Sequence, residues 1–311
     1  MTLDARARFF IAVARLSSRL PAFRGRTRIF LELYRLLGLQ HRHVAARARL
    51  REPVAFNAEL DLHSWLQRVA FLTGGYESDT TQFLVQLYAL TGAEGYLLDV
   101  GANIGLIAIP FARMRDRHTP RVICAEAVPD NVRALRRNLA LNQLERDVLV
   151  LPYALGDERK TAMIQVEGDL RAGEGSGTAN ILADDTTHEC VRQEITVETL
   201  DSLVAAGAIA PRCTVIKIDT DGYDLKVLQG GRAFLHRDRP VIFGEFSAHC
   251  LAWHNQSLHD VLAFAASIDY AVWRRLMPNW KFTPAHENDA FDQDLLLVPN
   301  ERAADYSRYL V

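Results

Sequence analysis

The sequence predicts an α/β fold in which helices cover both faces of a Rossmann-like, mostly parallel sheet of seven strands. Three observations predict it. Short apolar segments alternate with helix-like segments from residue 96 to residue 298. The first apolar segment, 96–100, is nearly continuous, as expected of a strand buried on both faces. A glycine-rich turn follows it directly, at the edge of the sheet where such folds bind their ligands.

The strands are predicted from the apolar segments in chain order. They lie at 96–100, 121–126, 148–152, 214–219, 240–245, 269–274 and 293–298. Helix-like stretches between them include 130–142 and 223–235. Between 160 and 200 the alternation breaks into short strands around a glycine-rich loop, 168–180. That loop is either an unstructured surface segment or a lid over a substrate.

The residues before the first strand are predicted to add a helical extension and a cap to this fold. Apolar residues recur at helical spacing in 9–20 and again in 29–37, with arginines between them. Residues 53–63 are predicted to be extended. A short helix starts at Asp61, with the aspartate as its cap, and another helix spans 79–90.

Four regions follow from this pattern. We expect a basic helical extension at 1–50, a cap with connecting helices at 51–95, the main ligand-binding domain at 96–300 and a C-terminal tail at 301–311.

The composition is that of a globular protein, with 49% apolar and 24% charged residues in a chain of 311. No apolar run approaches the ~20 residues that a membrane-spanning helix needs, and no cleavable leader is recognisable. We therefore expect a cytoplasmic protein. The four cysteines lie too far apart in the sequence to form a zinc-type pair, so we expect buried thiols. The clustered aspartates at 219–224 could hold a divalent cation, but nothing in their spacing requires one, and we expect no metal site.

The charge of the chain is unevenly distributed. Residues 1–50 contain eleven arginines against Asp4 and Glu32, a net charge of +9, which leaves −11 for the remainder. A solvated helix face that also docks on the acidic body is the simpler interpretation. A peripheral contact with anionic lipid or with an acidic partner is the alternative, and the apolar residues of these helices are also compatible with a homodimer. We expect no nucleic-acid partner.

The turn after the first strand has the features of a nucleoside-binding site. It reads Asp99-Val-Gly101-Ala-Asn103-Ile-Gly105, and its glycines allow a sharp turn and a close approach of ligand to backbone. Asp99 can accept a hydrogen bond from an amine or hydroxyl of the ligand. Glu126 ends the second strand about 20 residues further on, where an acidic residue binds the two hydroxyls of a ribose.

The glycine spacing restricts the chemical class of the ligand. It is G-x-x-x-G, and the G-x-G-x-x-G that packs a pyrophosphate against a helix is missing. A ligand with a ribose and no pyrophosphate fits better, and S-adenosylmethionine is such a ligand. Its ammonium and sulfonium groups also suit an acidic pocket. A nicotinamide-dependent oxidoreductase is the less favoured alternative.

Several motifs in one order resemble the FkbM family of S-adenosylmethionine-dependent methyltransferases. The resemblance spans about residues 60 to 300 and rests on Gly75-Tyr-Glu77, Leu98-Asp-Val-Gly-Ala-Asn-Ile-Gly105, Glu126-Ala-Val-Pro129, Asn138, Asn142, Ala154-Leu-Gly-Asp157, Gly175-Ser-Gly-Thr-Ala-Asn180, Thr199-Leu-Asp201, Ile216-Lys-Ile-Asp-Thr-Asp-Gly222, Val227-Leu-Gln-Gly230 and Glu245. It implies a class I methyltransferase fold and methylation of hydroxyl oxygens on sugars, glycolipids, polyketides or related metabolites. The acceptor would be a small molecule or a saccharide.

The resemblance also implies a set of cofactor-binding residues. Tyr76 and Glu77 would fold over the cofactor from their place before the first strand. The full set is Glu77, Asp99, Gly101, Asn103, Gly105, Glu126, Ala127, Asn131, Ala154 and Asp219.

One segment departs from the family pattern. The usual Asp-x-Glu-Gly-x-Glu reads Asp219-Thr-Asp221-Gly222-Tyr-Asp224 here, so both glutamates are one methylene shorter. This change bears on which carboxylate touches the substrate more than on cofactor binding. It is also the one feature that favours a non-catalytic cofactor-binding or scaffolding protein.

The candidates for proton transfer follow the fourth and fifth strands. Asp219 ends the fourth strand beside the expected methyl group, and Asp221 follows in the turn. Glu245 ends the fifth strand, and His249 comes next. Methyl transfer to a weakly acidic hydroxyl benefits from such a base. Each side chain also has a structural interpretation, as a helix cap, a satisfied carboxylate or a polar surface residue; we interpret Lys217 as structural, on the face opposite Asp219.

Overall fold

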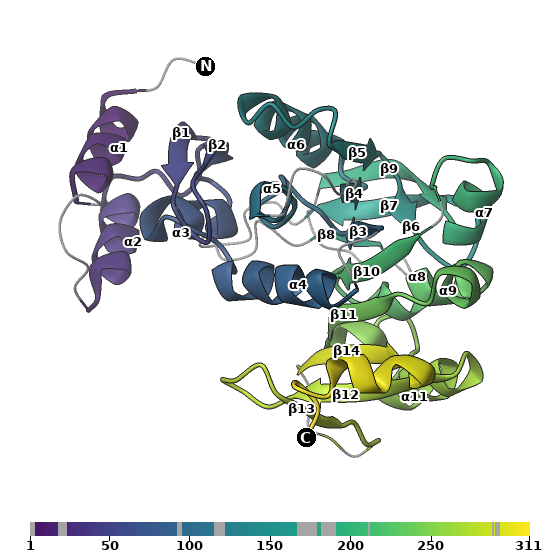
Figure 1. The fold of residues 1–311 in the computed structure, drawn as a ribbon. Coiled ribbons are helices and arrows are strands. Elements are labelled where there is room, and N and C mark those ends of the chain that lie inside the picture. The colour runs from purple at the N-terminus through teal and green to yellow at the C-terminus, as the bar shows by residue number, and fades with distance from the viewer. Residues whose placement is uncertain are drawn as a thin grey trace.

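The computed structural model describes residues 4–17, 24–91, 95–114, 122–166, 179–181, 191–210, 212–287, 289 and 293–311. Within these residues the chain forms the predicted α/β fold, a central sheet between two layers of helices, with an additional helical layer from the N-terminal residues (Figure 1). No helix in the described part of the chain is both long and apolar enough to cross a bilayer.

The central sheet has eight strands, one more than the sequence predicted. In spatial order they are β13(Phe282–Pro284), β12(Tyr270–Arg275), β14(Gln293–Pro299), β11(Val241–Phe246), β10(Cys213–Ile218), β3(Tyr96–Val100), β4(Val122–Ala125) and β5(Val148–Leu151). The seven predicted strands are all present, and their bounds differ from the prediction by at most one residue. The prediction missed β13, a three-residue edge strand that ends in proline and carries no alternation to detect.

The order of the strands locates the ligand-binding edge. From β3 the chain moves outward to β4 and β5, then returns to the other side of β3 to form β10 and β11. All four of these pairings are parallel, and β14 is inserted antiparallel between β11 and β12. The order therefore reverses between β3 and β10, and a crevice forms outside the carboxyl ends of these strands.

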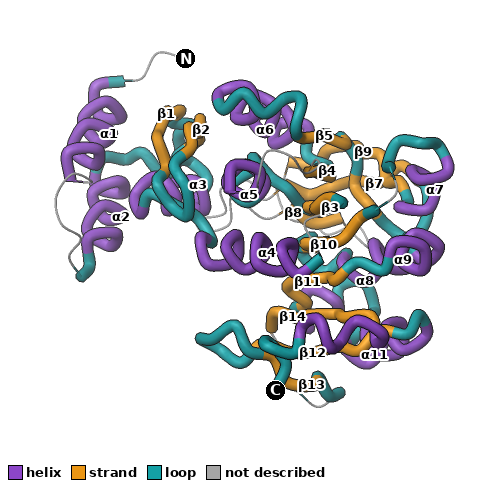
Figure 2. Tube along the Cα trace, in the orientation of Figure 1, coloured by secondary structure: helices purple, strands orange, loops and turns teal. Residues whose placement is uncertain are grey.

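Two apolar cores lie on the two faces of the sheet. On one face, side chains such as Leu97 and Val215 pack against α4(Ser78–Leu90), α5(Ala108–Met114) and α6(Pro129–Leu141). On the other face, side chains such as Leu98 and Ile216 pack against α7(Leu200–Ala205), α8(Asp224–Gln229), α9(Arg232–Asp238), α10(Ala248–Ala252) and α11(Leu258–Ser267). Figure 2 shows these helical layers around the strands.

The stretch 223–235, predicted as one helix, is split into α8 and α9 at Gly230 and Gly231. A Cβ at Gly230 would lie 1.9 Å from the carbonyl oxygen of Gly156. The two glycines thus let the chain change direction where it touches a neighbouring loop.

A second, smaller sheet covers part of the crevice. It consists of β6(Ala154–Leu155), β9(Val191–Glu198), β7(Lys160–Val166) and β8(Ala179–Ile181), in that order. The predicted short strands between 160 and 200 belong to it. The glycine-rich loop predicted at 168–180 lies outside the described residues except for its last two positions.

The N-terminal residues form α1(Ala5–Ser17), α2(Arg26–Leu36), the hairpin of β1(Ala45–Leu50) and β2(Phe56–Asp61), and α3(Trp65–Thr73). The expectation that residues 1–50 are purely helical is therefore wrong for 45–50. The cap of α3 is Ser64, whose hydroxyl accepts from the backbone N–H of Gln67. Asp61 instead accepts hydrogen bonds from the backbone N–H groups of Val44 and His63, so its carboxylate does not cap α3.

Two asparagines attach this hairpin to the main domain. The side-chain amide of Asn138 accepts from Glu59 N at 2.7 Å and donates to Ile104 O at 3.1 Å. Asn142 accepts from Asn57 N at 2.9 Å and donates to Asn57 O at 2.7 Å. The two side-chain amides thus form hydrogen bonds with backbone groups at the free edge of β2, which a further strand would otherwise pair with.

A candidate cofactor and active site

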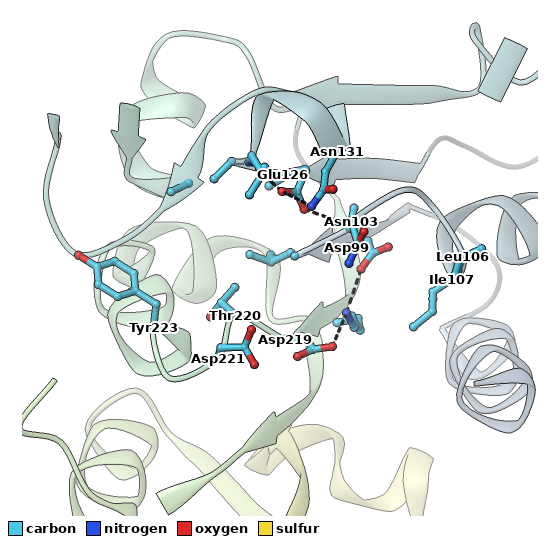
Figure 3. Close-up of a pocket in the computed structure, with 18 of the residues that line it drawn as sticks. Asp99, Asn103, Leu106, Ile107, Glu126, Asn131, Asp219, Thr220, Asp221 and Tyr223 are labelled. Carbon is cyan, nitrogen blue, oxygen red and sulfur yellow. Dashed lines mark hydrogen bonds and ion pairs between the residues drawn. The ribbon is translucent and has the colours of Figure 1, made fainter. Parts of the chain in front are cut away.

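A pocket of about 400 Å³ opens at the carboxyl ends of β3, β4, β10 and β11 (Figure 3). Its volume lies in the range of small-molecule sites. Nine of the ten predicted cofactor residues line it, namely Glu77, Asp99, Gly101, Asn103, Glu126, Ala127, Asn131, Ala154 and Asp219. The tenth, Gly105, lies outside the lining.

The turn after β3 is held in a shape that only glycine permits at its start. Gly101 has φ 79°, and a Cβ there would lie 1.9 Å from the carbonyl oxygen of Asp219. Gly105 has φ 90°, and a Cβ there would meet Leu135 of α6 at 2.6 Å. Gly101 therefore brings the turn against the end of β10, whereas Gly105 allows close packing of the turn on a helix.

Glu126 links the ends of β3 and β4. Its carboxylate accepts from Asn103 N and Val128 N, both at 2.8 Å, and from Asn131 Nδ2 at 3.4 Å. Figure 3 shows these side chains converging at the same wall of the pocket. Burial raises the pKa of Glu126, and the backbone donors oppose that shift. The carboxylate is thus fixed in one orientation and still faces the cavity, as a ribose-binding group must.

Asp99 is a fully buried carboxylate that lines the pocket. Neither of its oxygens has a hydrogen-bond partner among the described residues, and Lys217 Nζ lies 3.6 Å from Oδ1. Burial raises the pKa of Asp99, and the ammonium of Lys217 counteracts this. A buried carboxylate with unused acceptors is expected to find a donor, and a ligand amine in the pocket could supply it.

The interpretation of Lys217 as a residue facing away from the site is wrong. Its ammonium lies 3.2 Å from Asp219 Oδ2 and lines the pocket. Residues two apart along a strand point to the same side of a sheet, so Lys217 and Asp219 share a face. Burial would lower the pKa of Lys217, but Asp219, Asp99 and Glu77 outweigh it and raise that pKa, so the side chain is a cation.

Glu77 reaches the same group of charges from the N-terminal side. It precedes α4 in a left-handed conformation with φ 40°, and it lines the pocket with Tyr76. Burial raises the pKa of Glu77, and the nearby ammonium of Lys217 lowers it. The structure thus brings together Glu77, Asp99, Lys217 and Asp219 from three separate parts of the chain.

The proton-transfer candidates Asp219, Asp221 and Glu245 all line the pocket. Asp219 follows the last residue of β10, and Glu245 lies near the end of β11, the adjacent parallel strand, in which Gly244 pairs with Ile218. The side chain of Glu245 is exposed at the pocket. Burial of its inner part, followed by the negative charges of Asp219, Asp294 and Glu77, raises its pKa to about 7. Asp221 has a left-handed φ of 51° in the intervening turn.

Asp224, the first residue of α8, has a structural role in the turn before that helix. Its buried carboxylate accepts from the backbone N–H and hydroxyl of Thr220 and from Gly222 N, at 2.8 to 3.0 Å. Burial raises its pKa to about 6. The Asp224 carboxylate, one methylene shorter than the glutamate of the family pattern, therefore holds the turn that carries Asp221.

His249 is not brought to the pocket. It lies exposed on α10, and its ring packs edge-on against Trp253 at 4.9 Å. His254 is closer, because its ring contacts the pocket residue Tyr223 at 5.0 Å.

Sequence reasoning missed the apolar part of the pocket. Four aromatic side chains line it, namely Trp65, Tyr76, Tyr153 and Tyr223, together with aliphatic residues that include Leu106 and Ile107. Tyr76 is the exception, because the resemblance implies that it folds over the cofactor with Glu77. Trp65 comes from the cap and has no local signal, because its place at the pocket depends on the docking of α3.

Across the described part of the chain, no group of three or more histidine, cysteine, aspartate or glutamate side chains is arranged to hold a metal ion. The clustered pocket carboxylates are instead associated with Lys217.

Comparisons with known proteins identify the family of the chain. The family model for the methyltransferase FkbM domain matches residues 99–272. No curated protein sequence matches the chain. Among solved structures, the chain is similar to the methyltransferase FkbM from Methylobacillus flagellatus, with 18% identity, a TM-score of 0.40 and coverage of 75% of this chain. The chain spans about half, 52%, of that protein's length.

A second similar structure is the O-methyltransferase from Bacillus cereus in complex with SAH. Its identity is 16% and its TM-score 0.39, with 96% of this chain and 92% of that one covered. The family model covers more than half of the chain and confirms the resemblance read from the motifs. The chain belongs to the FkbM family of methyltransferases, and S-adenosylmethionine is its cofactor.

Proposed function

We propose that the chain transfers the methyl group of S-adenosylmethionine to a hydroxyl oxygen of a saccharide or specialised metabolite, such as a glycolipid or polyketide. The observation that carries this proposal is Glu245, a carboxylate at the pocket with a pKa raised to about 7. A general base works best when its pKa lies near the operating pH, and a hydroxyl needs a base more than a stronger nucleophile does.

The cofactor would be held along the ends of β3 and β4. Glu126, fixed by Asn103 N and Val128 N, would accept from the ribose hydroxyls. The oxygens of Asp99 have no hydrogen-bond partner among the described residues, and they would accept a hydrogen bond from the ammonium group of S-adenosylmethionine. When bound, S-adenosylmethionine supplies an electrophilic methyl group on a sulfonium.

The acceptor would enter between β10, β11 and the cap. Glu245 would take the hydroxyl proton as the acceptor oxygen bonds to the methyl carbon and the bond from that carbon to sulfur breaks, so that a neutral thioether, S-adenosylhomocysteine, leaves. Asp219, held by Lys217 at 3.2 Å, orients the acceptor by accepting a hydrogen bond from it. Proximity and orientation of this kind supply much of the rate of such a displacement.

The aromatic side chains favour an acceptor with apolar faces and polar edges. Trp65, Tyr76, Tyr153 and Tyr223 line the pocket, and tyrosine and tryptophan combine an apolar face with a hydrogen-bonding group. A sugar ring has that combination of surfaces.

The test measures methyl transfer, as release of S-adenosylhomocysteine, to a panel of saccharides, glycolipids and polyketides across pH 5 to 9. Turnover should rise with pH through about 7, because Glu245 must be deprotonated to act as a base. Glu245→Gln should lower kcat about 10²-fold and remove that rise. Asp219→Asn should lower kcat more than cofactor affinity. An unchanged pH profile in Glu245→Gln would remove Glu245 from the chemistry.

A further inference from the structure

The outer faces of α1 and α2 are unlike the rest of the surface. In α1 the buried residues Ala7, Phe10, Ile11 and Ala14 lie on one face of the helix. In α2 Phe30 and Tyr34 are buried, and the ring of Phe10 packs edge-on against both, at 6.2 and 5.1 Å. Figure 1 shows the two helices at the end of the molecule farthest from the second sheet, so their opposite faces point to solvent.

Large apolar side chains are concentrated on those opposite faces. They are Phe9 (53% exposed), Leu16 (63%), Ile29 (55%) and Leu36 (84%). Each helix carries two, at the spacing of i and i+7, which places them two turns apart on one side. Solvated helices seldom expose such residues in a group, and a group of this kind marks an interaction site.

Arginines flank these apolar residues. Arg8 precedes Phe9, Arg15 precedes Leu16, Arg28 precedes Ile29 and Arg35 precedes Leu36. Arg35 pairs with Glu32, the one acidic residue within the two helices. Arg8 and Arg28 form no ion pair with any described residue. Arg15 donates a hydrogen bond to the backbone carbonyl of Arg47 at 2.6 Å and keeps its positive charge. The outer face, defined by these four apolar and four arginine side chains, is thus both apolar and cationic.

We propose that this outer face docks on an anionic lipid bilayer, with the helices lying in the plane of the interface. Apolar side chains can enter the acyl boundary while the adjacent guanidinium groups bind lipid phosphates, which is the arrangement of interfacial helices. Attraction to anionic headgroups contributes most for basic residues close to the surface.

The charge argues against a second copy of the chain as the occupant. A twofold interface places one patch against itself, so the arginines of both copies would face each other. The exposed apolar side chains argue against nucleic acid, because they would find no apolar partner along a phosphate backbone.

The test uses the full chain and sedimentation with vesicles of neutral phosphatidylcholine or of a phosphatidylcholine and phosphatidylserine mixture. The chain should bind the anionic vesicles, and binding should weaken as salt is raised. Arg8→Gln combined with Arg28→Gln should lower the partition coefficient about tenfold or more. Leu36→Ser should lower it severalfold, whereas Met277→Ser, at a 73% exposed position elsewhere, should leave it unchanged.

These positions are exposed, so melting temperatures close to that of the unmodified chain will show that the variants fold. Absence of binding to anionic vesicles would overturn the proposal. Equal binding to neutral and anionic vesicles would also contradict it. Analytical ultracentrifugation distinguishes the remaining occupant: a dimer that Leu36→Ser dissociates would identify the face as a contact between copies.

Discussion

At the scale of single residues, the pocket is organised by one buried cation among carboxylates. Lys217 lies 3.6 Å from Asp99 and 3.2 Å from Asp219, and its charge also acts on Glu77. Without it, Asp99 would be a buried charge with no compensating partner among the described residues. Breaking a buried ion pair on one side costs far more than removing an exposed pair.

Lys217→Met, which keeps the length of the side chain and removes its charge, should therefore lower the free energy of unfolding by about 3 kcal/mol. Urea denaturation measures this. The matched control is Lys226→Met, because Lys226 pairs with the partly exposed Asp157 at 3.1 Å. This variant should lower the free energy of unfolding by less than about 1 kcal/mol. Equal losses of unfolding free energy in the two variants would mean that the buried Lys217 stabilises the fold no more than a partly exposed ion pair does.

At the scale of elements, the cap is fixed to the main domain through the edge of β2. Asn138 is fully buried on α6 and satisfies the backbone N–H of Glu59. This contact determines where the chain enters α3, and hence where Trp65 and Leu66 meet the pocket. Asn138 and Asn142 belong to the motifs that resemble the family, but their role as hydrogen-bond partners of β2 depends on how β2 packs beside α6.

Asn138→Ala should cost about 2 kcal/mol of stability, because it leaves Glu59 N and Ile104 O without their buried partner. Arg136→Ala, an exposed position on the same helix, should change the free energy of unfolding by less than about 0.5 kcal/mol. Thermal or urea unfolding measures both variants. Equal free energies of unfolding for the two would show that the Asn138 amide does not stabilise the fold.

The elements that could be predicted from the sequence are those with a local cause. The apolar run 96–100 and the glycines after it identify β3 and its turn without any knowledge of neighbours. The close approach of Gly230 to the carbonyl of Gly156 could not be predicted, because the two residues lie far apart in the sequence. The same holds for β13.

At the scale of the whole molecule, the site joins segments that no local pattern connects. Glu126 and Asp99 were predicted from spacing and line the pocket together. Trp65 and Tyr153 reach it only because the cap and the second sheet pack over the crevice. His249 was a plausible base by position along the chain, but the chain turns at α10 and leaves it on the surface.

The central claim is that the chain binds S-adenosylmethionine in this pocket through Glu126. Calorimetric titration of the cofactor into the full chain tests it most directly. The account predicts one molecule bound per chain and an affinity at least about tenfold lower in Glu126→Ala, since hydrogen bonds to a charged group are each worth about 1.5–3 kcal/mol. The exposed Glu145→Ala should bind as the unmodified chain does. Undiminished affinity in Glu126→Ala would contradict the account.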